Sequence, residues 1–441
     1  MRHIKKPVVT RYRERGLLAT IEAGLRYTLR SLLAAMERRE LKKLDMLRGS
    51  YREGDPRLSW GSSGENNSGS EIFETLKYVQ SLIQSQTYPV DQRLDFDVIT
   101  VTDTRFPGGS TSSTVEEILT QSRSKLRSGL YHLPSFKMRF RDAPSPKIKQ
   151  LIDDQHVILT NGLSGRLKAK VLLFRHPSIL NPDGAPLPEM DADEVILIVN
   201  HPPIKFGSIE YLLPDAIRKL RNAYGCDPKV FPIGPLVRDA IAEAYDGTVK
   251  IEKDDWVNIF DISRFQFERP FPSGRRMRIG RHSRPNKEKW PARAEDILAA
   301  YPESDDMEVH ILGGADIPTG ILGRTPENWV VHQFGDIDAA EFLKTIDIFV
   351  YFHHPDWIEA FGRVIVEAMA SGLPTVLPHH FEPLFEDAAL YCSEDGVGAM
   401  IDFLRIPENY ADMSARARHA AVRRFSADVH RERLRYLGVT S

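Results

Sequence analysis

Two glutamates stand eight positions apart in the stretch DWIEAFGRVIVEAMASGLPTV. Glu359 comes just before an expected helix, and Glu367 lies within that helix among valine, isoleucine and methionine side chains. A carboxylate in such apolar surroundings is costly unless a partner satisfies it. Arg363 stands four residues before Glu367 and could pair with it on a solvated face. The alternative, which we favour, is that Glu367 receives hydrogen bonds from a ligand.

A basic segment follows an expected strand further upstream. The segment RIGRHSRPNKEKWP leaves the strand at Gly280 and presents five basic side chains within ten residues: Arg281, His282, Arg284, Lys287 and Lys289. Alone, this pattern is typical of a solvated loop. Gly362, in the first turn of the helix after Glu359, would let a phosphate approach the amide dipoles at the helix N-terminus.

Two other strand ends add apolar and polar groups. In VVHQFGDID a strand ends with Phe334 and Gly335. These two residues could equally be a core ring with a turn glycine or a ledge for a flat base. In LPTVLPHHFEPLFED another strand ends, and His379, His380 and Glu382 lie in the loop that follows it. Four successive strand ends thus bring basic, apolar, acidic and amide groups to one rim. Such a set suits a nucleoside diphosphate, with cations for the diphosphate and carboxylates for the ribose.

Short apolar runs alternate with helical segments from about Asp95, which predicts buried parallel strands and the α/β class. The first series comprises residues 96–102, 156–160, 170–174, 194–200 and 229–234. The second comprises residues 276–281, 308–314, 328–335, 346–352, 373–378 and 389–392. Two such series predict two Rossmann-like domains with ligands in the cleft between them. We place these domains at 95–270 and 271–408, followed by an amphipathic helix at 409–441.

The first 94 residues form a separate basic extension. Residues 1–48 carry 13 Lys and Arg against 5 Asp and Glu, a net charge of +8. Apolar residues at spacings of three and four between Leu18 and Met36 predict an amphipathic helix. Through residues 10–48, such a helix can lie on an anionic membrane, pair with another helix or cover its own protein. A Gly/Ser/Asn linker follows at residues 61–70.

Bulk properties limit the class of protein. A chain of 441 residues with 41% hydrophobic and 27% charged residues is typical of a soluble protein with more than one domain. The net charge of −2 does not indicate a nucleic-acid partner. Cys226 and Cys392 are far apart, so neither a disulfide framework nor a zinc site is expected. We expect a cytoplasmic protein, which the basic helix could hold at the inner face of the plasma membrane.

The spacing of Glu359 and Glu367 is an E-x7-E motif. With GRHSRPNKEKWP upstream, it resembles the retaining GT-B glycosyltransferases of the "glycosyl transferases group 1" family. The resemblance covers roughly Asp95 to the C-terminus and is strongest in the second domain. It implies the GT-B fold, in which two Rossmann-like domains face a central cleft and the last helix crosses back to the first domain. It also implies sugar transfer from a nucleoside-diphosphate sugar with retention, without a metal or other cofactor.

The resemblance also assigns roles to residues. Glu367 would bind the ribose, Glu359 would lie near the donor sugar, and Arg281 would contact the diphosphate together with a lysine. Lys289, before Trp290, fits that lysine better than Lys287. The expected donor-binding residues are Glu367, Gly362, Phe361, Phe334, Gly335, Gly108, Gly109 and His380. Gly108 and Gly109 lie in DTRFPGGSTSS, after the first strand. After GLPTV the family often has a loop of small residues, whereas this sequence has the bulky PHHFEP.

The first domain should hold the acceptor. His201 ends the strand in VILIVNHPPIKFG and is a candidate contact for the transferred sugar or an acceptor hydroxyl, or else a structural histidine. Arg175 and His176 are weaker candidates. The favoured function is a transferase that builds cell-surface polysaccharide or glycolipid on a saccharide or lipid-linked saccharide acceptor. The alternatives are a nucleotide-sugar epimerase, a phosphorylase, or a non-catalytic nucleotide-binding protein.

Overall fold

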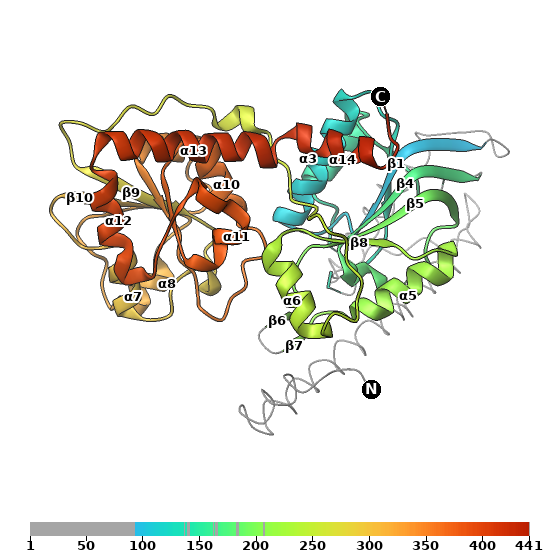
Figure 1. The fold of residues 1–441 in the computed structure, drawn as a ribbon, viewed down its shortest axis with the longest axis horizontal. Coiled ribbons are helices and arrows are strands. Elements are labelled where there is room, and N and C mark those ends of the chain that lie inside the picture. Colours follow the sequence, from blue (N-terminus) through green and yellow to red (C-terminus); the bar gives the residue numbers. More distant parts are fainter. Residues whose placement is uncertain are drawn as a thin grey trace, which may run out of the picture.

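The computed structural model describes residues 93–440, apart from residues 136, 139–141, 162, 164–165, 182–184 and 206–207. The predicted basic helix through residues 10–48 and the linker at 61–70 lie outside the described residues. Within them, two α/β domains lie side by side, each built on a parallel sheet (Figure 1). The prediction of two successive α/β domains is confirmed.

The first sheet has six parallel strands in the order β3-β2-β1-β4-β5-β8. They are β1 (Leu94–Thr102), β2 (Ser128–His132), β3 (Ile158–Leu159), β4 (Leu167–Arg175), β5 (Met190–Val199) and β8 (Lys229–Pro232). The five predicted strands of this domain are confirmed, and β2 is an addition. Helices α3 (Gly109–Arg123), α4 (Pro146–Asp153), α5 (Leu213–Tyr224) and α6 (Pro235–Tyr245) surround it. A short antiparallel pair, β6 (Ile204–Lys205) and β7 (Ser208–Ile209), follows β5.

The second sheet has the order β11-β10-β9-β12-β13-β14. Its strands are β9 (Met277–His282), β10 (Met307–Leu312), β11 (Trp329–His332), β12 (Ile348–Val350), β13 (Thr375–Leu377) and β14 (Leu390–Tyr391). All six were predicted. Its helices are α7 (Ala294–Ala300), α8 (Asp316–Leu322), α9 (Ala339–Thr345), α10 (Arg363–Ala370), α11 (Glu382–Phe385) and α12 (Val397–Leu404). In both sheets the order of connection reverses beside the first strand, between β1 and β4 and between β9 and β12.

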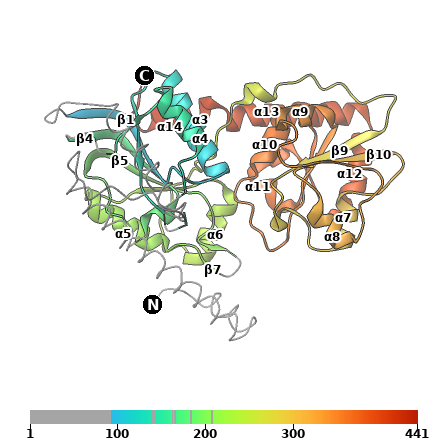
Figure 2. The same cartoon turned by 180° about the vertical axis from the view of Figure 1, so that it is seen from behind.

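The C-terminal segment consists of two helices, α13 (Pro407–Phe425) and α14 (Ala427–Tyr436), where one had been predicted. Ser426 separates them with an extended backbone, and this break lets the chain change direction. α13 packs on α10 of the second domain, and α14 returns to α3 of the first domain (Figures 1 and 2). No helix in the described part of the chain is both long and apolar enough to cross a membrane.

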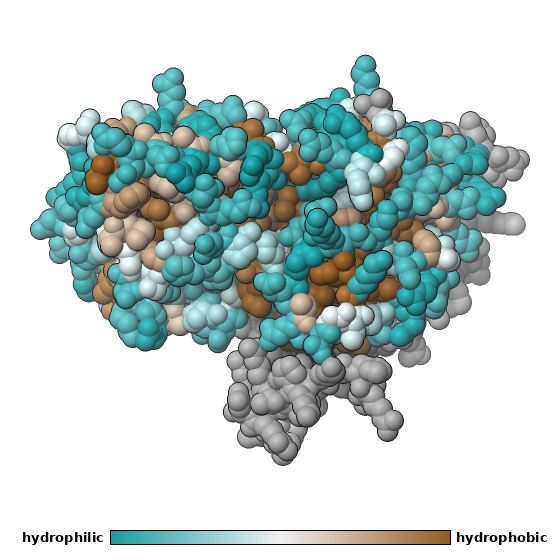
Figure 3. Space-filling model, viewed as in Figure 1, coloured by the Kyte–Doolittle hydropathy of each residue, from teal (hydrophilic) through white to brown (hydrophobic). Residues whose placement is uncertain are grey.

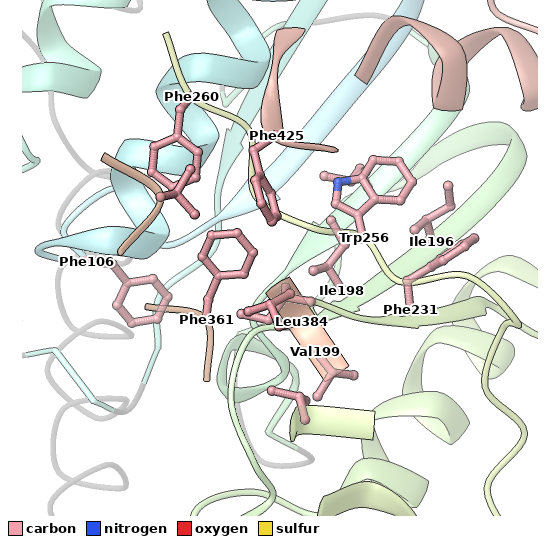
Figure 4. Close-up of a cluster of buried hydrophobic side chains, with 14 of the residues drawn as sticks. Phe106, Ile196, Ile198, Val199, Phe231, Trp256, Phe260, Phe361, Leu384 and Phe425 are labelled. Atoms are coloured by element: carbon pink, nitrogen blue, oxygen red, sulfur yellow. The ribbon is translucent and has the colours of Figure 1, made fainter. Parts of the chain in front are cut away.

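The two domains share a buried apolar cluster at their junction (Figure 4). In it, Phe361 stacks on Phe260 with ring centroids 5.8 Å apart and meets Phe425 edge-on at 5.6 Å. Phe361 is only 4% exposed, so its assignment to the donor-binding surface was wrong and it is a core residue of the junction. On the face drawn in Figure 3, further apolar side chains gather around α6 and β8, within a largely hydrophilic surface.

Candidate active site

The loops after β9 and β12 are the expected ligand site of the second domain, because they flank the reversal of strand order. The matching loops of the first domain approach them. A guanidinium nitrogen of Arg284, after β9, lies 3.5 Å from where a Cβ would stand at Gly108, after β1. The Lys205 ammonium lies 3.9 Å from the centre of the Trp357 ring, in the loop after β12. Both domains therefore contribute to the candidate site.

Lys289 and Glu359 form a shielded ion pair in this site. Lys289 Nζ contacts Glu359 Oε2, and the two side chains are 11% and 14% exposed. The Tyr351 hydroxyl donates to the same oxygen at 3.1 Å. Burial acts to raise the pKa of Glu359, but the Lys289 ammonium opposes it, and the pKa lies below its ordinary value. Glu359 is therefore ionised at neutral pH and holds Lys289 in place, whereas Lys287 is exposed.

Glu367 in α10 has a protein partner that we had disfavoured. Arg363 Nε donates to Glu367 Oε1 at 2.9 Å, so the pair spaced by four residues does form. The pair with Arg363 forms because α10 turns Arg363 along the same face, while ligand binding by Glu367 stays a prediction. The second oxygen, Oε2, lies 3.6 Å from His282 Nε2. Oε2 is therefore the atom of Glu367 through which a ligand could bind.

Arg281 lies deeper than expected. Its side chain is fully buried, and Nη1 donates to the Tyr301 hydroxyl at 2.9 Å and to the Phe352 carbonyl at 3.1 Å. Nη2 donates to the Lys289 carbonyl. The predicted direct contact with a diphosphate is therefore corrected, because this guanidinium is enclosed by the protein. Arg281 braces the loop that carries Lys289, and the exposed cation facing the first domain is Arg284.

His201 follows β5 and lies in a charged cluster of the first domain. Its Nε2 is 3.1 Å from Lys137 Nζ and 3.8 Å from Glu210 Oε2, and Lys137 contacts Glu210 as well. Burial is the largest influence on His201 and lowers its pKa to about 4, so the imidazole is neutral at pH 7. The sequence did not indicate Lys137, because it lies 64 positions before His201 and belongs to no motif.

Comparison with solved structures identifies the fold. A glycosyltransferase from Rickettsia africae superposes with a TM-score of 0.53 and 13% identity, over 78% of this chain and 98% of that chain. HepE from Anabaena, solved with UDP-glucose, gives a TM-score of 0.52 and 14% identity, over 77% of this chain and 98% of that chain. This chain has the GT-B fold. No protein-family model and no curated protein sequence matches it.

The remaining residues predicted to bind the donor lie on several different loops of the two domains. Phe334 is 64% exposed after β11 and, next to Gly335, offers an open apolar ledge. Gly108–Gly109 lie exposed at the start of α3. His380 follows β13, and its Nε2 lies 3.0 Å from Nε2 of His353, which the sequence had not indicated. These groups therefore lie on loops that follow four different strands of the two sheets.

Gly362 has a left-handed backbone conformation directly before α10. Its φ of 74° is left-handed, which favours glycine because other residues pay a steric penalty there. A Cβ at this position would stand 2.7 Å from Ile365 Cδ1. The Gly362 carbonyl accepts from the Ile365 amide at 2.9 Å and so begins the helix. The predicted role of Gly362 beside a phosphate stays a prediction.

Proposed function

We propose that this protein is a glycosyltransferase that moves a sugar, with retention, from a nucleoside-diphosphate sugar to a saccharide or lipid-linked saccharide acceptor. The observation that carries the proposal is the placement of Lys289, Glu359 and Glu367 at one edge of the second sheet of a GT-B fold. HepE, which has a similar fold, was solved with UDP-glucose, so UDP-sugars are the first donors to test.

The proposed mechanism follows from the charge that develops on the leaving group. Breaking the bond between the sugar and the diphosphate places negative charge on the phosphate. Lys289 and Arg284 would stabilise that charge, together with the amides that follow Gly362. These contacts act most strongly when closure of the domains excludes water. The lone pair of His201 Nε2 is taken by the Lys137 ammonium, so neutral His201 would donate from Nδ1 to a hydroxyl oxygen of the sugar or acceptor. No protein nucleophile is required.

Donor binding can be tested by thermal shift with UDP, GDP and ADP. One of them should raise the unfolding midpoint of the wild type, because a ligand of the native state stabilises it by RT ln(1 + [L]/Kd). Glu367→Gln should weaken that binding about tenfold or more, because a charged acceptor is lost. Glu382→Gln, at the exposed first residue of α11, is the matched control and should bind as the wild type does.

The same test can reject the proposal. If none of the nucleotides shifts the wild type, donor binding by this site is contradicted. If one does, product analysis with UDP-sugars by NMR reports the anomeric configuration, and inversion would exclude the retaining mechanism. Activity that disappears in EDTA and returns with a divalent cation would contradict the metal-independent proposal.

We further propose that the basic region at residues 10–48 holds the enzyme at an anionic membrane, where lipid-linked acceptors for polysaccharide or glycolipid synthesis lie. The region carries most of a +8 charge and an amphipathic pattern. Deleting residues 1–70 should abolish co-sedimentation with vesicles that contain anionic lipid and leave nucleotide binding intact. Unchanged co-sedimentation of the shortened protein would refute the membrane role.

A further inference from the structure

A half-buried tryptophan of the second domain contacts a lysine of the first domain. Lys205, the last residue of β6, places its ammonium 3.9 Å from the centre of the Trp357 ring. Trp357 lies in the loop between β12 and α10, two residues before Glu359. An ammonium within about 6 Å of a ring centre is attracted by the ring quadrupole, and tryptophan attracts it most strongly. The contact therefore joins the two domains beside the candidate site.

The same ring also attracts the lysine that we assign to the leaving group. Lys289 Nζ lies 5.2 Å from the centre of the Trp357 ring and contacts Glu359. Trp357 thus has one ammonium from each domain within the range of a cation–π contact. A displacement of the Trp357 ring would change the surroundings of Lys289.

Two loops of the second domain are bonded to each other around this ring. The His354 amide donates to the Glu288 carbonyl at 3.1 Å, and the Trp357 amide donates to the His354 carbonyl at 2.9 Å. The ion pair of Lys289 with Glu359 joins the same two loops a second time. A contact that fixes Trp357 therefore also restricts the loop that carries Lys289.

The strand pair that carries Lys205 is itself held in place. β6 pairs with β7, and next to this pair the Glu210 amide donates to the Pro203 carbonyl at 2.8 Å. The Tyr211 hydroxyl donates to the His201 carbonyl at the base of the segment. Lys205 is therefore presented to Trp357 from a braced element of the first domain.

We propose that Lys205 is a positioning residue for the transfer reaction, because its contact with Trp357 sets the loop that holds Lys289. This inference rests on the proposed function and goes further, since it names the group through which the first domain controls the leaving-group cation of the second. A cation–π contact changes the equilibrium between a docked and an undocked loop by about threefold to thirtyfold.

The kinetics of donor turnover by the full chain test this inference, with UDP-, GDP- and ADP-glucose as donors and release of nucleoside diphosphate as the signal. Lys205→Met keeps the length of the side chain and removes its charge. It should lower kcat by about threefold to thirtyfold and leave KM nearly unchanged, because Lys289 acts as the sugar bond breaks. Lys205→Arg should recover most of kcat, because a guanidinium also makes cation–π contacts.

Lys229→Met is the matched control. Lys229 is a partly exposed lysine of the same domain, and it begins β8 at the edge of the sheet opposite to the candidate site. This variant should change kcat by no more than about twofold.

Double variants separate positioning from direct contact with the donor. In Trp357→Leu and in Lys289→Met, adding Lys205→Met should change kcat by no more than about twofold, because each background has already removed a link. A Lys205 that touched the donor itself would lower kcat in both backgrounds as much as in wild type. That result would overturn the positioning role.

Near-ultraviolet circular dichroism tests the contact without a substrate. Lys205→Met should change the tryptophan bands relative to wild type. The same substitution should leave them unchanged in the Trp357→Leu background, where the affected ring is absent. Identical bands in wild type and Lys205→Met would show that Lys205 does not fix Trp357, and the inference would be overturned.

The outcomes separate this inference from the proposed function. If wild type turns over a donor and Lys205→Met has the same kcat, the positioning role is overturned and the proposed function stands. If Lys205→Arg is as slow as Lys205→Met, the cation–π contact is not the cause and the inference is likewise overturned. If wild type turns over none of the three donors, the proposed function itself fails, and this inference fails with it.

Discussion

Lys289→Met is expected to lower kcat for donor turnover by about 10²- to 10³-fold. Lys289 is a shielded cation, and its position is fixed by Glu359 and by the loop that Arg281 braces. The charge that it would stabilise appears on the diphosphate only as the sugar bond breaks, so kcat should fall more than KM rises. Release of nucleoside diphosphate from the donor, followed by chromatography, measures the effect without knowledge of the acceptor.

Two control variants make this prediction specific. Lys287→Met removes an exposed cation two positions away and should change kcat by no more than about twofold. Lys289→Met also leaves Glu359 without its ion partner, so lost activity could reflect a damaged fold. The double variant Lys289→Met/Glu359→Gln removes both charges, and it should regain thermal stability and remain slow. A slow Lys287→Met beside a normal Lys289→Met would reverse the assignment of the two lysines.

The strands were predictable because their apolar runs need no information beyond the local sequence. β1 and β5 end in buried runs rich in valine and isoleucine, VITVT in β1 and VILIV in β5. β2 could not be found in this way, because SGLYH has no such run. Its Gly129 instead fits beneath Ile99 and Phe96, where a Cβ would stand 2.9 and 3.2 Å from their side chains. Tertiary packing, rather than local propensity, places β2 in the sheet.

The site was predictable as a set of loops but not as a set of contacts. Parallel strands bring their carboxyl ends to one edge, so the loops carrying Lys289 and Glu359 had to meet. The direction of each side chain depends on packing that the sequence does not reveal. Consecutive residues of a strand face opposite sides, so Arg281 enters the core and His282 turns to Glu367. A motif therefore located these positions without distinguishing a contact residue from a bracing one.

The largest loss of stability is expected from Arg175→Met. Arg175 ends β4 and pairs with Glu117 of α3 at 2.5 Å, with side chains 0% and 1% exposed. Trp256, from the segment between the domains, donates to the same Glu117 oxygen at 2.8 Å. Arg175 is therefore a structural residue, not the acceptor contact that the sequence left open. Removing Arg175 leaves the buried Glu117 carboxylate without its cation. This should reduce the free energy of unfolding by about 3–5 kcal/mol in urea titrations.

The pH dependence of stability should change sign in the same variant. In wild type, burial acts to raise the pKa of Glu117, but Arg175 opposes it and the pKa lies below the ordinary 4.5. The pair therefore stabilises the protein above about pH 4.5 and is lost as the pH falls further. Without Arg175, burial should raise the pKa of Glu117 above its unfolded value. Arg175→Met should then gain stability relative to wild type as the pH falls from neutral toward about 5, because protonation neutralises the stranded carboxylate.

Two comparisons decide whether the ion pair or mere side-chain removal causes the loss. Glu117→Gln/Arg175→Met removes both charges and keeps an acceptor for Trp256, so it should recover most of the stability and show no inverted pH dependence. Arg166→Met breaks an exposed pair with Asp191, whose side chains are 75% and 45% exposed, and should cost less than about 1 kcal/mol. A loss for Arg175→Met as small as that for Arg166→Met would mean that water reaches Glu117. The buried network that joins α3, β4 and the segment between the domains would then contribute little to holding them together.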